Sequence, residues 1–168
     1  MENSKSKSNI VLIGMPGCGK TTLGKILSEK LNIQFVDLDQ KIEEKANKAI
    51  PDIFKEFGEQ YFRKLENEVC KEVSKKNNQV ISCGGGIVIN ENNMLNLKQN
   101  GLVVYITRDI DKLATNNRPL SKNIDALKEI KNIREPLYIK YSDLQVDNNE
   151  DINNAVNKII EEIEKKGI

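Results

Sequence analysis

The sequence contains no histidine, the side chain that most often transfers protons in enzymes near neutral pH. A Ser-His-Asp triad, a histidine-ligated metal and histidine acid–base catalysis are therefore excluded. Cysteine is also sparse: Cys18, Cys70 and Cys83 are odd in number, widely spaced and form no C-x-x-C pair. This usage argues against a zinc site and fits a reducing cytosol, so we expect a cytoplasmic protein.

The chain has neither a strong net charge nor a long apolar run. Its 26 basic and 25 acidic residues leave a net charge of +1, so we expect neither a nucleic-acid nor a membrane partner. The longest apolar runs, near 10–13 and 102–106, are far shorter than the roughly 20 residues that span a bilayer. Residues 1–9 are polar and lack the apolar centre of a signal peptide. We expect a monomeric single domain over residues 1–168, with a flexible N-terminus at 1–8.

Arginine is scarce among the basic residues. Only four of the 26 are arginine, namely Arg63, Arg108, Arg118 and Arg134. Because lysine serves at almost every other basic position, we expect arginine mainly where a planar, bidentate donor is needed. Each arginine is therefore a position to inspect for anion binding.

The stretch GMPGCGKTT at residues 14–22 matches the phosphate-binding pattern G-x-x-x-x-G-K-[ST]. A buried strand is expected at 9–13, and apolar residues at helical spacing predict a helix at 20–31. In such a turn, backbone N–H groups and the helix N-terminus attract phosphate. Lys20 would reach the β- and γ-phosphates of a nucleotide, and the Thr21 hydroxyl would ligate Mg²⁺. The alternative is a glycine-rich turn before an ordinary helix.

Two further predicted strands end in residues that could face the same phosphates. The strand at 33–36 leads to Asp37 and Asp39, and the strand at 79–83 leads to three glycines at 84–86. Ligands bind at the carboxyl ends of strands in open α/β sheets, and glycines let a substrate lie against bare backbone. The alternative for Asp39 is that it caps a helix expected at 40–47.

Two arginines have both a functional and an ordinary interpretation. Arg63 lies one turn before Glu66 on a helix expected at 59–75, and the pair is either a surface ion pair or an anion-binding arginine held in place. Arg118 lies in a loop expected at 116–123, which is either a mobile lid over a phosphoryl group or a simple connector.

The other two arginines lie at the ends or breaks of predicted elements. Arg134 comes just before Pro136, which we expect to kink or interrupt the helix at 125–141. It either points into a pocket or pairs at the surface with Glu135 or Lys131. We interpret Arg108, which precedes a short helix expected at 110–115, as a surface or capping residue.

Strands and helices alternate through the whole chain. The strands are expected at 9–13, 33–36, 79–83, 102–106 and 142–147. This alternation predicts an α/β protein whose parallel sheet is covered by helices on both faces, a three-layer α/β/α architecture.

Together these motifs resemble the shikimate kinase family. The resemblance runs from Ile10 to about Glu164 and rests on GMPGCGKTT at 14–22, VDLD at 36–39, IPDIF at 50–54, GEQYFRKLE at 58–66, CGGG at 83–86, RPL at 118–120 and REPLY at 134–138. It implies a five-stranded parallel sheet in the order 2-3-1-4-5, a substrate-binding region at about 34–62 and a mobile lid at about 114–124. It also implies transfer of the γ-phosphoryl group of ATP to the 3-hydroxyl of shikimate, with Mg²⁺ as cofactor, in aromatic amino acid biosynthesis.

The resemblance further implies a role for each candidate residue. Asp39 would hold the reacting hydroxyls of shikimate, while Arg63 and Arg134 would grip its carboxylate. The substrate would lie against Gly84, Gly85 and Gly86. Thr21 would ligate the metal, and Asp37 would hold it through water. The ATP-binding residues would be Gly17, Cys18, Gly19, Lys20, Thr21, Thr22 and Arg118.

Two other classes of protein stay open at this point. One is a kinase for gluconate or a nucleoside monophosphate. Monophosphate kinases usually carry several lid arginines, and gluconate kinases would lack the arginine of REPLY paired with Arg63. The other is a nucleotide-gated switch, but the Asn-Lys pairs at 47–48 and 157–158 lack the aspartate of the guanine motif N-K-x-D.

Overall fold

The computed structural model describes residues 7–113 and 120–167, with the side chains of 120–123 left aside. The predicted lid residue Arg118 lies outside the described residues. In chain order the elements are β1 (Asn9–Ile13), α1 (Lys20–Leu31), β2 (Gln34–Asp37), α2 (Leu38–Ala46), α3 (Ile50–Phe57), α4 (Glu59–Ser74), β3 (Gln79–Ser82), the 3₁₀ turn η1 (Ile87–Ile89), α5 (Glu91–Asn100), β4 (Gly101–Thr107), the 3₁₀ turn η2 (Ile110–Lys112), α6 (Leu120–Tyr141), β5 (Leu144–Asp147) and α7 (Ile152–Lys166).

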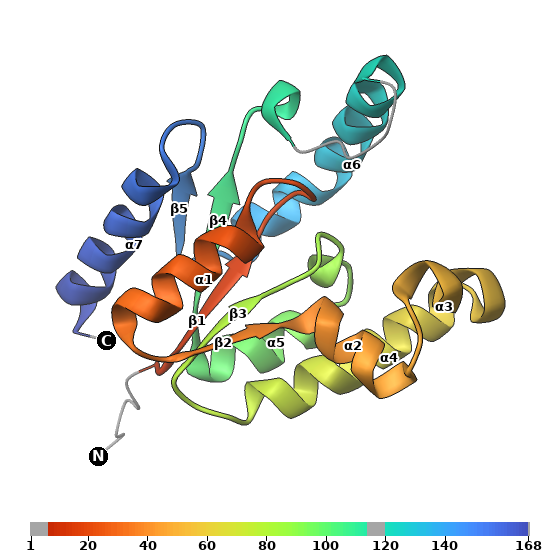
Figure 1. The fold of residues 1–168 in the computed structure, drawn as a ribbon, viewed down its shortest axis with the longest axis horizontal. Helices are drawn as coiled ribbons and strands as arrows, with labels where there is room; N and C mark the ends of the chain where they lie inside the picture. The colour runs from red at the N-terminus through yellow and green to blue at the C-terminus, as the bar shows by residue number, and fades with distance from the viewer. Residues whose placement is uncertain (1–6, 114–119, 168) are drawn as a thin grey trace.

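The five strands form one parallel sheet in the order β2-β3-β1-β4-β5. Helices α1 and α7 lie side by side over one face, and α4 and α5 pack together over the other (Figure 1). The predicted three-layer fold and its strand order are therefore confirmed. Because all strands run the same way, their carboxyl ends meet at one edge of the sheet, where ligands bind in folds of this type.

Strand β1 lies at the centre of the sheet. Val11 pairs with Ile81 of β3 on one side and with Val103 of β4 on the other. All five residues of β1 are buried, which is why the four that follow Asn9 form a continuous apolar run rather than an alternating pattern. The loop that follows β1 is thus held between the ends of β3 and β4.

Most predicted elements begin and end within two residues of their expected positions, and helix α2 begins two residues before its expected start. Asp37, not Asp39, caps it: Asp37 Oδ1 accepts the backbone N–H groups of Asp39 at 3.0 Å and Gln40 at 3.4 Å. The helix therefore starts at Leu38, and the alternative in which Asp39 caps it is wrong. Asp39 sits in the first turn of the helix, with its side chain free for another role.

Helix α6 differs more from the prediction. It runs from Leu120 to Tyr141 straight through Pro136, so the expected interruption is absent, and the loop expected at 116–123 is already helical from Leu120. Asn132 and Pro136 are both exposed, so water can satisfy the carbonyl group that the proline leaves without a donor. The short helix expected at 110–115 is instead the 3₁₀ turn η2.

Hydrogen bonds hold the start of the described chain near the residues that precede β3 and β4. The Ser8 backbone N–H donates to Asn100 O at 3.1 Å, and its hydroxyl donates to Asn77 Oδ1 at 3.0 Å. Within residues 7–113 and 120–167, no helix combines the length and apolar character needed to cross a bilayer.

Candidate active site

The loop between β1 and α1, residues 14–19 (the phosphate loop), depends on glycine conformation. Gly14, Gly17 and Gly19 have φ values of 150°, 80° and 95°, which other residues rarely adopt. Space is also short, because a Cβ atom on Gly14 would lie 2.6 Å from Ile106 O, and one on Gly19 would lie 2.6 Å from Asn148 Nδ2. Side chains at these positions would force the loop away from β4 and from the residue that directly follows β5 (Leu144–Asp147).

Lys20 is held against the loop that precedes it. Its buried ammonium donates to Gly14 O at 2.6 Å and Met15 O at 3.0 Å, and it lies 3.6 Å from Cys18 Sγ. The Cys18 side chain is buried beneath the loop, so what this residue can offer a ligand is its backbone. Lys20 is therefore positioned by backbone carbonyls before any anion arrives.

The phosphate loop opens into a cavity of about 440 Å³ at the carboxyl edge of the sheet. Residues from the loop, the start of α1 and the ends of β2, β3 and β4 meet there. The lining residues are Pro16, Gly17, Gly19, Lys20, Thr21, Thr22, Asp37, Asp39, Ser82, Cys83, Gly84, Gly85 and Arg108. Nine predicted site residues thus share one cavity: Gly17, Gly19, Lys20, Thr21, Thr22, Asp37, Asp39, Gly84 and Gly85.

Asp39 is the most perturbed acid of this cavity. Burial raises its pKa above the ordinary value, and the nearby Asp37 raises it further, whereas Lys20 and Arg63 act in the opposite direction. A Cβ atom on Gly84 would lie only 2.8 Å from Asp39 Oδ1, so this carboxylate rests against bare backbone. A carboxylate with a raised pKa accepts a proton more readily than an ordinary aspartate.

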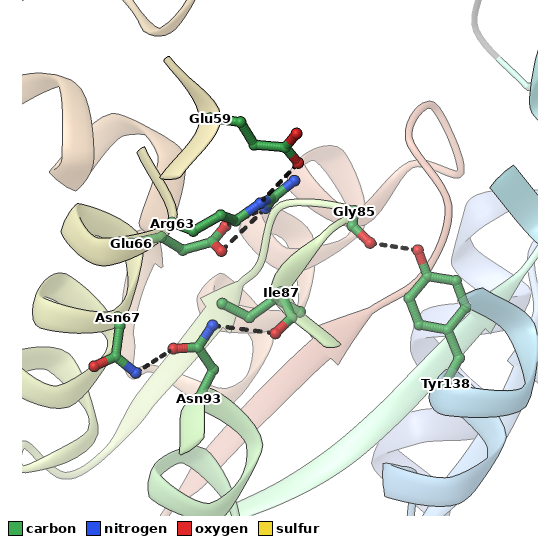
Figure 2. A network of polar contacts seen from close by, with 8 residues as sticks. All are labelled: Glu59, Arg63, Glu66, Asn67, Gly85, Ile87, Asn93 and Tyr138. Carbon is green, nitrogen blue, oxygen red and sulfur yellow. Dashed lines mark hydrogen bonds and ion pairs between the residues drawn. The ribbon is translucent and has the colours of Figure 1, made fainter. Parts of the chain in front are cut away.

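Arg63 is fixed by acids from its own helix (Figure 2). Its Nη1 donates to both carboxylate oxygens of Glu66, at 3.1 and 3.3 Å, and its Nε lies 3.6 Å from Glu59 Oε1. Glu66 is only 2% exposed, and burial raises its pKa despite the neighbouring guanidinium. The pair is therefore not a surface ion pair, and the interpretation of Arg63 as an arginine held in place is favoured.

Arg63 and Arg134 flank the same three glycines, Gly84–Gly86 (the glycine turn). A Cβ atom on Gly86 would lie 2.5 Å from Arg63 Nη1, and one on Gly85 would lie 3.2 Å from Arg134 Nη1. Arg134 comes from α6, and its neighbours Lys131 and Glu135 pair with each other at 3.6 Å. Two guanidinium groups from different helices thus reach one short segment of backbone.

Two side chains anchor the glycine turn from opposite sides (Figure 2). The Tyr138 hydroxyl donates to Gly85 O at 2.5 Å, and Asn93 Nδ2 donates to Ile87 O at 3.2 Å. Asn93 is itself held by Asn67, whose Nδ2 donates to its Oδ1 at 2.8 Å. Tyr138 is the last residue of the REPLY motif, but the sequence assigned no role to it or to Asn93, since their roles arise from this tertiary packing.

Arg108 is a further site residue that the sequence did not reveal. We expected a surface or capping residue, yet it lines the cavity beside the phosphate loop, so that interpretation is wrong. Its Nε is buried and has no hydrogen-bond partner within the described part of the chain, a feature that it shares with Arg63. The scarcity of arginine was the one signal that could have marked it.

The cavity offers oxygen atoms of the kind that Mg²⁺ prefers. Thr21 and Asp37 both line it. Because Asp37 uses Oδ1 to cap α2, its second oxygen can serve a metal or a water molecule. The residues present therefore fit the metal that the sequence resemblance implies.

Comparison with known proteins gives one consistent family. The model of the shikimate kinase family matches residues 16–164 of this chain. A shikimate kinase of Clostridium botulinum (strain Eklund 17B) is 48% identical over 121 residues, covering 70% of this chain and 73% of its own length. A shikimate kinase of Clostridium beijerinckii is 39% identical over 162 residues, covering 94% and 95%.

Solved structures agree. The shikimate kinase of Acinetobacter baumannii in complex with shikimate superposes with a TM-score of 0.87 at 34% identity, covering 94% of this chain and 93% of that one. The enzyme of Aquifex aeolicus gives 0.85 at 36% identity, covering 95% and 98%. A phosphate loop and a pair of arginines on one glycine turn, in a chain that matches this family over nearly its whole length, mean that the protein belongs to the shikimate kinase family.

Proposed function

We propose that this protein transfers the γ-phosphoryl group of ATP to the 3-hydroxyl of shikimate, giving shikimate 3-phosphate and ADP. The observation that carries the proposal is the position of the glycine turn. Gly84 and Gly85 line the cavity of the phosphate loop, and Gly85 and Gly86 lie against Arg134 and Arg63. A phosphate donor and a carboxylate-bearing acceptor would therefore bind on two sides of one turn.

On the donor side, the loop N–H groups, the N-terminus of α1 and Lys20 would bind the phosphates of ATP. Lys20 would exchange its bonds to Gly14 O and Met15 O for bonds to the transferring group. Such preorganised donors act where negative charge develops during phosphoryl transfer.

On the acceptor side, Arg63 and Arg134 would bind the carboxylate of shikimate with forked hydrogen bonds and so fix the ring. Asp39 would orient the attacking hydroxyl and accept its proton. Burial has already raised the pKa of the Asp39 carboxyl, which brings it closer to that of an effective base. Positioning of the two reactants supplies much of the rate enhancement in reactions of this kind.

Thr21 and Asp37 would hold Mg²⁺, Thr21 directly and Asp37 through water. The ion would neutralise part of the charge on the phosphates and orient them. Arg118 lies outside the described residues, and its contact with the phosphates stays a prediction. We also expect the protein to act as a monomer in the cytoplasm, in the pathway to aromatic amino acids.

An assay of ADP release with several acceptors tests the proposal. Shikimate should be phosphorylated in the presence of Mg²⁺ and ATP, whereas gluconate and nucleoside monophosphates should not. Turnover of one of those acceptors with shikimate inert would overturn it. Tight nucleotide binding with no turnover of any acceptor would instead favour a nucleotide-gated switch.

A substitution in the pair Arg63 and Arg134, the proposed clamp for the shikimate carboxylate, gives a sharper test. Arg134→Lys keeps the charge but loses the fork, so the shikimate KM should rise by about 10- to 100-fold, the equivalent of one charge-assisted hydrogen bond. The ATP KM should stay within about twofold, because Arg134 is not among the described residues that line the cavity of the phosphate loop. Lys131→Met, which removes a charge from the same helix, is the control. An unchanged shikimate KM in Arg134→Lys would refute the clamp.

A further inference from the structure

We propose that Arg108 binds the phosphate chain of the nucleotide, as a second cation beside Lys20. The proposal rests on the proposed function in one respect only, that the cavity of the phosphate loop takes up ATP. It does not depend on which acceptor is phosphorylated.

The sheet brings Arg108 to the phosphate loop. Strand β4 pairs with β1 up to the match of Ile13 with Tyr105, and the end of β4 then runs along the start of the loop. The contact is so close that a Cβ atom on Gly14 would meet Ile106 O. Arg108 follows directly after β4 and lines the cavity together with Gly17, Gly19, Lys20, Thr21 and Thr22.

The guanidinium of Arg108 has a donor to offer. Its Nε is buried without an acceptor among residues 7–113 and 120–167, and a buried N–H without a partner destabilises a protein. The adjacent carboxylate does not use it, because Asp109 lies 4.0 Å from Lys112 Nζ and accepts from Asn149 Nδ2 at 3.3 Å. Arg63 Nε is also buried without a hydrogen bond, but that guanidinium is paired with Glu59 at 3.6 Å and with Glu66 through Nη1.

The charges of the side chains that line the cavity favour a second basic residue at the phosphates. The lining includes two acids, Asp37 and Asp39, and two basic residues, Lys20 and Arg108. Lys20 alone would leave the lining with a surplus of negative charge, which opposes the binding of a polyphosphate. Arg108 balances the two carboxylates, and its planar fork matches the oxygen pairs of phosphate.

Calorimetric titration of the full chain with ATP, ADP, adenosine and inorganic tripolyphosphate tests the proposal. Arg108→Met keeps the apolar stem and removes the fork. It should weaken binding of ATP, ADP and tripolyphosphate by about 10- to 100-fold, as expected for hydrogen bonds to a charged group, and leave adenosine unchanged. Arg108→Lys should recover part of the loss. Lys165→Met, which removes one exposed charge at the end of α7, should change none of these affinities.

Two results would overturn the proposal. Equal weakening of adenosine and ADP in Arg108→Met would mean contact with the base, and no weakening of any ligand would mean no contact with the nucleotide. Thermal unfolding of each variant controls for misfolding, and the milder Arg108→Lys replaces Arg108→Met if the latter does not fold. Since binding is measured without an acceptor, failure to phosphorylate shikimate would refute the proposed function and leave this inference standing.

Discussion

Removing one hydroxyl group from α6 should weaken acceptor binding and leave the nucleotide site unchanged. Tyr138 is fully buried, and its hydroxyl donates to Gly85 O at 2.5 Å. Arg134 lies one turn earlier on the same helix and reaches the same glycine. Tyr138→Phe would keep the ring and its packing against Tyr105, whose centroid is 5.0 Å away, and would remove the hydrogen bond to Gly85 together with the contact between the hydroxyl and Arg134.

The size of the effect follows from the carbonyl that is left behind. A buried acceptor without a donor costs about 1–3 kcal/mol. In a domain of this size each kcal/mol lowers Tm by about 2–4 °C, so Tm should fall by about 2–12 °C. If the less rigid glycine turn makes the free energy of shikimate binding less favourable by about 0.7–1.4 kcal/mol, the shikimate KM should rise by about 3- to 10-fold.

A coupled assay of ADP release, with each substrate varied in turn, separates the two effects. The shikimate KM should rise while the ATP KM stays within about twofold, because Tyr138 is not among the described residues that line the cavity of the phosphate loop. Tyr141→Phe is the matched control: its ring is also buried on α6, but its hydroxyl makes no hydrogen bond within the described residues. A lower Tm with an unchanged shikimate KM would refute the positioning role of Tyr138 and leave a purely structural one.

Three other substitutions test the rest of the site. Lys20→Ala should abolish turnover at any ATP concentration that can be reached in the ADP-release assay; substantial residual activity would contradict its role at the phosphates. Gly19→Ala adds a Cβ atom 2.6 Å from Asn148 Nδ2 at a φ of 95°. ADP binding measured by calorimetry should therefore weaken by at least about 10-fold, while shikimate binding persists. Equal loss of both affinities would indicate damage to the whole fold. Asp39→Asn should eliminate activity yet raise Tm at pH 7. Folding raises the pKa of Asp39, so the stability that this group contributes is present below its ordinary pKa and is lost as pH rises through the folded value. The gain in Tm of Asp39→Asn over the parent should therefore vanish in unfolding scans below about pH 4, and a gain that is constant from pH 3 to 8 would contradict this account.

Much of the fold could be predicted because its signals are local. The apolar run of β1, the glycine pattern of the phosphate loop and Asn32, which closes α1 at a φ of 54°, all act within a few residues of where they appear. The acids after β2 and the glycines after β3 were expected at the ligand edge for a topological reason, since parallel strands end together.

The predictions failed where tertiary contacts, rather than the local sequence, determine the structure. Asp37 and Asp39 are both good helix caps by type, and only the backbone path after β2 selects Asp37. Proline usually interrupts a helix, but Pro136 lies on an exposed side of α6, where water can bond the carbonyl group that lacks a donor, so the helix continues. Arg108 follows a strand in the manner of a capping residue, and only the pairing of β4 with β1 carries it to the cavity.

The central place of β1 also bears on how the molecule is made. Ile10 pairs with Val80 and Leu102, so β1 leaves the ribosome well before either of its partner strands. Until β4 has been synthesised, the run Ile-Val-Leu-Ile has no strand on one of its sides, and the loop after it has no wall. Strand pairings between segments that are distant in sequence form slowly, and they leave hydrophobic surface exposed until they have formed. The phosphate loop is therefore synthesised before the strand that completes its surroundings, and a nascent chain that stops short of Gly101 should be unable to bind ATP.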